Sequence, residues 1–240
     1  MSALVAQTKA ELVLTLRRGE SVLLVLLIPL LLLGFFSTVD VLPKGGFADP
    51  VDFLAPGILA LAVMSTGMVQ LAIGTAFERQ YGVLKRLGST PLGRPRLLTA
   101  KTMAIVAVEV LQVVLLVGLA VVLGWSPHVV AAAAVAIALG TVAFAGLGLL
   151  MAGTLRGEVT LAAANGLYLV LLLTGGMVVP LSELPSVVRT VAEVLPAAAL
   201  VEALTGTLTN GGTVSTKAWV VLAVWAVAAP AAAAATFRWE

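Results

Sequence analysis

Six long apolar runs, almost free of charge, divide the chain. They cover residues 21–37, 53–77, 102–124, 129–155, 159–179 and 218–237. A helix needs about 20 mostly apolar residues to cross a hydrocarbon core about 30 Å thick, and each run comes near that length. Because backbone polar groups must be paired inside a bilayer, each run is predicted to be an α-helix. The sequence therefore predicts an all-α, polytopic membrane protein with six transmembrane helices in one domain, residues 1–240.

Composition agrees with a membrane environment. Hydrophobic residues make up 60% of the chain and charged residues 11%, with a mean hydropathy of +1.12. Soluble domains have about 45–50% and about 25%, so a soluble monomer is excluded. The absence of cysteine excludes disulfides and thiolate metal sites, and the single histidine cannot form a metal cluster. With a net charge of only +2 and no soluble basic surface, membrane lipids are expected as partners and nucleic acid is not.

Basic residues predict which helix ends face the cytoplasm. With both termini placed inside, eleven of the 14 Lys and Arg residues fall on that side: Lys9, Arg17, Arg18, Arg79, Lys85, Arg86, Arg94, Arg96, Lys101, Arg156 and Arg238. The other three, Lys44, Arg189 and Lys217, fall on the outer side. Cytoplasmic loops of membrane proteins carry an excess of Lys and Arg, so we expect both termini to be cytoplasmic.

A polar, basic segment, residues 78–101, separates the second and third apolar runs. Within it, residues 80–87 contain one helix breaker, Gly82, and are followed by Gly88-Ser89-Thr90-Pro91, which predicts one short helix. Its apolar edge is too small to form a core, so the helix is expected to lie against lipid headgroups or against another protein. In the first case the segment is a topology determinant attracted to anionic lipid, and in the second it is a docking site.

Two further segments are predicted to be helical without spanning the membrane. Residues 180–212 repeat apolar residues at helical spacing on both sides of Pro196, which favours two short helices meeting there. Such backbone enters a membrane only where protein or a water-filled cavity covers it, so these helices are either re-entrant over an outer mouth or rest on the headgroups. Residues 3–18 carry apolar side chains on one face and Gln7, Glu11 and Arg18 on the other, which predicts an interfacial helix in residues 1–20, with a frayed terminus as the alternative.

Glu109 is the only Asp, Glu, Lys or Arg inside the predicted spans. Gln112 follows on the same helical face, and Gln70 and Asn165 lie in other spans. Because polar groups are costly in hydrocarbon, we expect these four side chains to form one polar patch inside the bundle. The patch is either part of a translocation path or proton site, or a structural clamp in which a protonated Glu109 hydrogen-bonds neighbouring helices.

No phosphate-binding loop of the pattern G-x-x-x-x-G-K-[ST] occurs in the sequence. We therefore expect no nucleotide site on this chain and no enzymatic activity, with ATP and Mg²⁺ bound by a partner. All three aspartates, Asp40, Asp49 and Asp52, precede the second apolar run, so no pair of intramembrane aspartates exists for a protease. Catalytic, cofactor and metal sites are accordingly predicted to be absent.

Two motifs resemble a known family, the ABC-2 permeases, which are the membrane subunits of type-2 ABC exporters such as the daunorubicin-resistance permease. Residues 78–92, E-R-Q-Y-G-V-L-K-R-L-G-S-T-P-L, are similar to the family pattern E-R-E-x-G-T-L-K-R-L-x-x-T-P-L. Gln80 and Val83 depart from that pattern, which has an acidic residue and Thr there. A P-x-x-x-L-P stretch followed by P-x-x-x-x-x-E-x-L is similar to Pro180, Leu184, Pro185, Pro196, Glu202 and Leu204.

The resemblance implies a coupling helix in residues 78–92 that docks on a separate ATPase subunit, with the short loop at Arg156 as a second docking point. The residues expected to dock are Glu78, Arg79, Gly82, Leu84, Lys85, Arg86, Leu87, Pro91, Arg156 and Glu158. The expected outer re-entrant gate comprises Pro180, Leu184, Pro185, Pro196 and Glu202. Gln70, Glu109, Gln112 and Asn165 are the candidate polar residues of the translocation path.

The resemblance further implies the permease subunit of an ATP-driven exporter in a bacterial plasma membrane. Two ATP-binding subunits and a second permease, either a copy or a relative, would complete the transporter and drive alternating access. An apolar path with few polar groups suits an amphiphilic or lipid-like substrate, such as a drug, lipid or natural product. The alternatives are an ion- or proton-coupled secondary transporter that uses Glu109, and a membrane scaffold that recruits a soluble partner.

Overall fold

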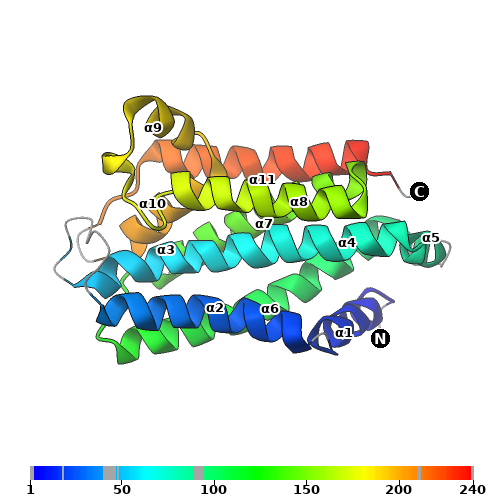
Figure 1. Cartoon of the computed structure of the whole chain (residues 1–240), viewed down its shortest axis with the longest axis horizontal. Helices are drawn as coiled ribbons and strands as arrows, with labels where there is room; N and C mark the ends of the chain where they lie inside the picture. The colour runs from blue at the N-terminus through cyan, green and yellow to red at the C-terminus, as the bar shows by residue number, and fades with distance from the viewer. Residues whose placement is uncertain are drawn as a thin grey trace.

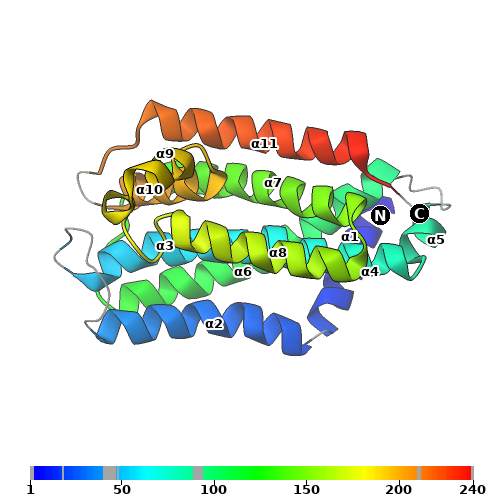
Figure 2. The ribbon, with the colours of Figure 1, turned by 45° about the horizontal axis from the view of Figure 1, so that its top comes forward.

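The fold is seen in a computed structural model, in which the structure describes residues 3–17, 19–39, 47, 49–88, 94–209 and 212–238. These residues form helices and no β-strand, so the predicted all-α class is confirmed. The helices are α1 (Ala3–Arg17), α2 (Gly19–Thr38), α3 (Pro50–Met64), η1 (Ser65–Gln70), α4 (Leu71–Gln80), α5 (Val83–Gly88), α6 (Arg94–Val122), α7 (Val130–Thr154), α8 (Gly157–Thr174), η2 (Leu181–Glu183), α9 (Ser186–Ala192), α10 (Pro196–Leu208) and α11 (Thr216–Thr236). The long helices run alongside one another in a bundle (Figures 1 and 2).

Within the described residues, five helices are long and apolar enough to cross a membrane. They are Pro50–Gln80, which joins α3, η1 and α4, then Arg96–Val122, Val130–Thr154, Gly157–Thr174 and Thr216–Thr236. The first predicted run corresponds to α2, whose described apolar part, Val25–Thr38, is shorter than these five. A membrane-embedded protein is therefore supported, while a sixth span in α2 stays a prediction.

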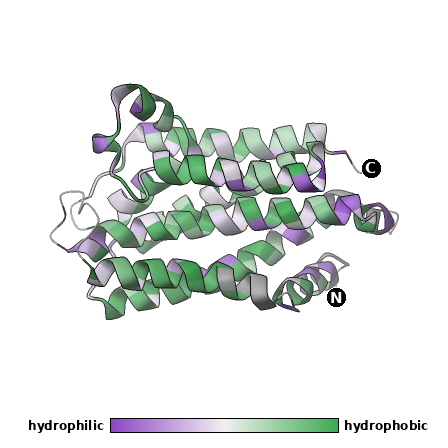
Figure 3. Ribbon diagram, in the orientation of Figure 1, coloured by the Kyte–Doolittle hydropathy of each residue, from purple (hydrophilic) through white to green (hydrophobic). Residues whose placement is uncertain are grey.

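The two ends of the bundle carry different elements. Both chain termini, α1 and α5 lie at one end, and α9 with the end of α10 lies at the other (Figures 1 and 2). Hydrophilic residues gather toward these ends, and the helices between them are mostly hydrophobic (Figure 3). We call the end with the termini and α5 the inner end and the opposite one the outer end, following the predicted orientation.

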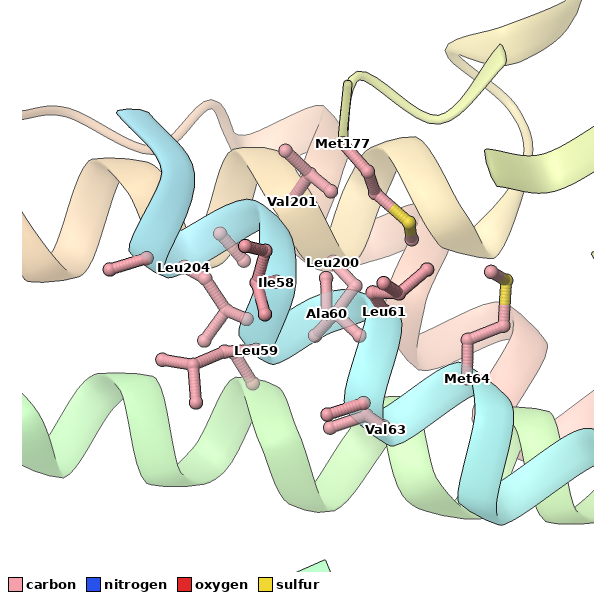
Figure 4. Packing of buried hydrophobic residues seen from close by; sticks show 14 of the residues in the cluster. Ile58, Leu59, Ala60, Leu61, Val63, Met64, Met177, Leu200, Val201 and Leu204 are labelled. Atoms are coloured by element: carbon pink, nitrogen blue, oxygen red, sulfur yellow. The ribbon is translucent and has the colours of Figure 1, made fainter. Parts of the chain in front are cut away.

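The largest core lies where α10 enters the bundle between α3, α7 and α11. Its side chains Leu200, Val201 and Leu204 pack against Ile58 and Leu61 of α3 (Figure 4). Ten of its residues, from Pro196 to Leu208, are buried, so protein surrounds most of this short helix. The predicted pair of helices meeting at Pro196 is present, because α9 precedes that residue and α10 begins with it.

Helix boundaries correct two of the predicted ranges. The polar segment 78–101 is not one long interruption, because α4 continues to Gln80 and α6 already begins at Arg94. Burial of Leu97 and Ala100 explains why helix extends so far into this basic stretch. The fifth run, predicted to reach residue 179, forms α8 and ends earlier, at Thr174. Gly176, with φ of +78°, adopts a left-handed conformation that ends the helix.

Candidate functional site

The short inner helix α5 has exposed basic side chains and packs on the bundle through a leucine. Gly82, with φ of +71°, makes the turn between α4 and α5. Leu84 is fully buried against Leu97 of α6, while Lys85 and Arg86 are exposed. Leu84 and Leu87 thus pack on the chain itself, whereas Val83, one turn before Leu87 on the predicted apolar edge, is exposed together with the basic side chains.

Further side chains of the predicted docking set fall into different environments. Leu87 is half-buried and, like Phe237, packs against the cluster of Leu84 and Leu97. Leu84 and Leu87 therefore both attach α5 to the bundle. Glu78 is half-buried and bonds inside the chain. Pro91 lies outside the described residues.

The two predicted docking points lie next to each other. Arg79, at the end of α4, donates a hydrogen bond to the backbone oxygen of Leu155, between α7 and α8. A Cβ placed on Gly157 would lie 3.2 Å from Cδ1 of Phe77, so the start of α8 closely approaches α4. Arg156 and Glu158 beside it are exposed. Lys85 and Arg86 of α5 and the turn at Arg156 therefore belong to the same end of the bundle.

Three charged side chains meet at the inner end, and we call them the inner charge cluster: Glu11, Glu78 and Lys101. The Lys101 Nζ donates to Oε2 of Glu11 at 2.9 Å and also to Oε2 of Glu78. The side chain of Lys101 is 5% exposed, that of Glu11 8% and that of Glu78 18%. Gln7 donates to the other oxygen of Glu11 at 2.9 Å. The cluster joins α1, α4 and α6 through two buried charges, Glu11 and Lys101, and the half-buried Glu78.

A cavity of about 420 Å³ lies beside this cluster. All three cluster residues line it, together with apolar side chains of α2, α4 and α6. Gln70 and Asn165, two of the predicted path residues, also line it, but Glu109 and Gln112 do not. The four candidate side chains therefore divide between this cavity, with Gln70 and Asn165, and helix interfaces, with Glu109 and Gln112.

Gln112 and Glu109 each bond across a helix interface. Gln112 accepts a hydrogen bond from the Thr66 hydroxyl at 2.9 Å and donates to the backbone oxygen of Val25 at 2.8 Å, which ties α6 to η1 and α2. Glu109 accepts a hydrogen bond from the hydroxyl of Thr141 in α7. Its Oε2 is buried and finds no hydrogen-bond partner among the described residues. Such bonds between helices have the form expected of a structural clamp.

Thr66 owes its position to η1, a π-helical segment that interrupts the span formed by α3 and α4. A π-turn widens the helix by one residue and changes which side chains face a neighbour. Gln70 ends the segment, and its Oε1 is buried without a hydrogen-bond partner within the described part of the chain. Apolar periodicity did not predict this irregularity, because the residues around it are uniformly hydrophobic.

At the outer end, Pro180 and Glu202 line a second cavity of about 440 Å³. Oε1 of Glu202 accepts a hydrogen bond from the backbone N–H of Ser215 at 3.2 Å. Leu184 ends η2, and Pro185 immediately precedes α9. Four of the predicted gate residues thus lie at the boundaries of η2, α9 and α10, whereas Glu202 lies within α10. Of these residues, only Pro180 and Glu202 share the cavity.

A second set of three charges, Arg189, Glu193 and Lys217, forms the outer charge cluster. Glu193 accepts hydrogen bonds from Lys217 at 2.7 Å and from Arg189 at 3.1 Å. These bonds, that of Lys217 first, lower the pKa of Glu193 below its ordinary value. Trp225 of α11 donates its Nε1–H to the backbone oxygen of Val194 at 2.9 Å. Together these contacts attach the turn between α9 and α10 to α11.

Sequence reasoning missed Glu11, Lys101, Thr66 and Thr141 as partners of the candidate residues. Glu11 stood on the polar face of the predicted first helix, and Lys101 closed the basic segment, but nothing in the sequence paired them. The two threonines give no signal, because Thr is common in apolar spans. Among the described residues, no group of His, Asp or Glu side chains could hold a metal ion.

Comparison with known proteins agrees with this architecture. The sequence profile of the family described as ABC-2 type transporter matches residues 2–209, which include α1 to α10. No curated protein matches the chain. Because the match covers most of the sequence, the chain belongs to the ABC-2 type transporter family, whose members are the membrane permease component of ABC transporters and work with an ATP-binding subunit.

Proposed function

We propose that this chain is the permease subunit of an ATP-driven exporter and that α5, with the neighbouring turn at Arg156, receives movement from the ATP-binding subunit. The observation that carries the proposal is the placement of α5. Leu84 fixes the helix to its own bundle, and Lys85 and Arg86 remain exposed on it. A helix that packs on the bundle with one side and exposes the other to a partner is suited to transmit a displacement of that partner to the bundle.

The connections of α5 support this role. Only Tyr81 and Gly82 separate it from α4, which is continuous with the span Pro50–Gln80. Arg79 also links the end of α4 to the turn between α7 and α8. Displacement of α5 would therefore move several spans together, which is the type of rigid-body change that shifts a bundle between inward- and outward-open states.

The cavity beside the inner charge cluster suits an amphiphilic or lipid-like cargo. Apolar side chains such as Ile28, Val69 and Ile105 form much of its wall, and Gln70 and Asn165 add neutral polar groups. Two ATP-binding subunits and a second permease would complete the transporter in the plasma membrane of a bacterium, with both termini cytoplasmic. Glu109 does not line this cavity, so no observation favours the ion-coupled alternative.

Co-purification tests the docking role. The intact chain is co-expressed with a candidate ATP-binding subunit, and the amount of subunit retained in detergent is measured. Lys85→Glu with Arg86→Glu should reduce retention at least about tenfold, because reversing exposed charges in an interface is strongly unfavourable. Lys9→Glu is the matched control, since Lys9 is an exposed base of α1 at the same end. Equal retention by all three proteins would refute docking through α5.

A further inference from the structure

We propose that Lys101 is a positioning residue that fixes α1 to α4 and α6, so that the three helices move as one unit when α5 is displaced. The inference rests on the proposed function of α5, and it assigns a role to α1 that the docking surface does not include. It is carried by the burial of Glu11 and Lys101, by the bond of Lys101 to the half-buried Glu78, and by the orientation of α1.

The orientation of α1 is the opposite of what apolar burial would produce. Within residues 5–17, Glu11 is the only buried residue. Val5, Val13, Leu14 and Leu16 are all exposed. Because α1 directs its apolar side chains outward and a carboxylate inward, apolar burial on the bundle cannot be what chiefly holds it there. The buried attachment point is the bond between Glu11 and Lys101.

The Lys101 ammonium also joins the two helices that flank α5, which are α4 and α6. Glu78 lies near the end of α4 and Lys101 near the start of α6, so their bond closes the base of the segment that contains α5. Lys101 thus forms ion pairs with Glu78 of α4 and with Glu11 of α1. A large displacement of α4 or of α1 relative to α6 would break one of these bonds.

Burial makes this connection stiff. A charge that loses its partner in a nearly dry environment is strongly destabilised, so a buried cluster tends to be wholly formed or wholly broken. Salt also screens such pairs far less than pairs at the surface. Since Glu11, Glu78 and Lys101 all line the 420 Å³ cavity, movement of the cluster changes the wall of that cavity as well. The cluster therefore connects α5, α1 and the cavity.

Spin labels test the attachment of α1 without any partner subunit. The chain contains no cysteine, so Ala10→Cys and Gln80→Cys can be labelled directly, and both positions are exposed. The distance distribution between them is measured by pulsed electron resonance in nanodiscs of phosphatidylcholine and phosphatidylglycerol. Glu11→Ala should broaden it about twofold or more, and Glu11→Gln, which keeps an acceptor without the charge, should give an intermediate width. Alanine favours helix, so circular dichroism should remain unchanged.

The matched control is Glu183→Ala, which removes an exposed carboxylate at the outer end and should leave the distribution unchanged. Lys101→Arg should retain most of the wild-type narrowness, because arginine keeps the charge and can bridge two carboxylates. A Glu11→Ala protein with the wild-type distribution would overturn the proposal, since α1 would then be held by other contacts.

A second measurement separates this inference from the proposed function. In the complex with the ATP-binding subunit, ATP and vanadate trap the nucleotide-bound state, and distances are measured from Val187→Cys on α9 to position 80 and to position 10. Both distances should shift in the wild type, whereas in Glu11→Ala only the one to position 80 should shift. No shift at position 80 in the wild type would refute coupling through α5. Equal shifts at position 10 in both proteins would refute the role of Lys101.

Discussion

The inner and outer ends of the bundle use mirrored charge arrangements in different environments. At the inner end one ammonium, Lys101, lies between two carboxylates, and at the outer end one carboxylate, Glu193, lies between two cations. The Lys101 side chain is 5% exposed, whereas that of Lys217 is 54% exposed. Since the value of an ion pair depends on its surroundings, the same chemistry should fix helices firmly at the inner end and only weakly at the outer end.

The outer end instead depends on apolar packing. There α10 is buried between α3, α7 and α11, with Leu200 and Leu204 in the largest core. The stability of such packing depends on how closely the side chains fit together and not on charge. Substitutions that leave a cavity or add atoms therefore destabilise it. The comparison therefore predicts that the inner end is sensitive to loss of charge and the outer end to changes of volume.

Lys101→Met should produce the largest effect of a single substitution. It leaves the buried Glu11 and the half-buried Glu78 without their shared cation, and breaking a buried ion pair such as that of Lys101 with Glu11 costs about 3–5 kcal/mol. The apparent unfolding midpoint in detergent should fall accordingly. The matched variant Lys217→Met removes an exposed lysine and should leave that midpoint almost unchanged. Equal losses in the two variants would show that burial does not distinguish the two clusters.

Gly57→Ala should have the next largest effect and tests the apolar side of the comparison. A Cβ at this position of α3 would lie 2.8 Å from the backbone oxygen of Met177, which cannot move as a side chain can. Overpacking of this kind costs about 1–3 kcal/mol. Gly118→Ala in α6 is the control, because its Cβ meets nothing within 4 Å and alanine favours helix. A stable Gly57→Ala protein would mean that the outer packing is looser than described.

Gln112→Leu examines a buried link that carries no charge. The substitution removes the bonds to the Thr66 hydroxyl and the Val25 backbone oxygen and leaves both groups without that partner. A loss of about 1–2 kcal/mol in unfolding free energy is expected. Asn165→Leu makes the same kind of exchange at an exposed amide that, among the described residues, bonds within its own helix, to the backbone oxygen of Leu161. If both variants lose the same stability, hydrogen bonding between helices is not what Gln112 contributes.

Apolar run length predicted the class of fold and most helix positions. The runs beginning at residues 102, 129 and 218 correspond to α6, α7 and α11 because uninterrupted hydrocarbon leaves the backbone no alternative to helix. The π-segment η1 could not be predicted, because one extra residue in a helical turn leaves no trace in composition. The fifth run was predicted five residues too long, to residue 179, because Met177, Val178 and Val179 continue the apolar run beyond Gly175 and Gly176.

The candidate site was predictable in part for the same reason. The sequence predicted that Lys85 and Arg86 would be exposed on α5, because two neighbouring basic side chains are costly to bury in so short a helix. The direction of Leu84 and the partners of Glu78 did not follow, because pairing between residues 11, 78 and 101 depends on how three helices pack. Likewise Glu109 and Gln112 were correctly placed on one helical face, but their separate partners, Thr141 and Thr66, depend on the neighbouring helices.

Lys217→Met should give the smallest effect, visible in the titration of Glu193 alone. The hydrogen bond from Lys217 is the first cause of the lowered pKa of this carboxyl, so its removal should raise the pKa toward the ordinary value. A carboxyl with a lowered folded pKa stabilises the fold above its ordinary pKa, and that contribution is lost as the pH falls through the lowered value. Carbon NMR of labelled glutamate measures the shift, with Arg189→Met as a weaker companion. A clear drop of the unfolding midpoint near neutral pH would mean that exposed charges also fix the outer helices.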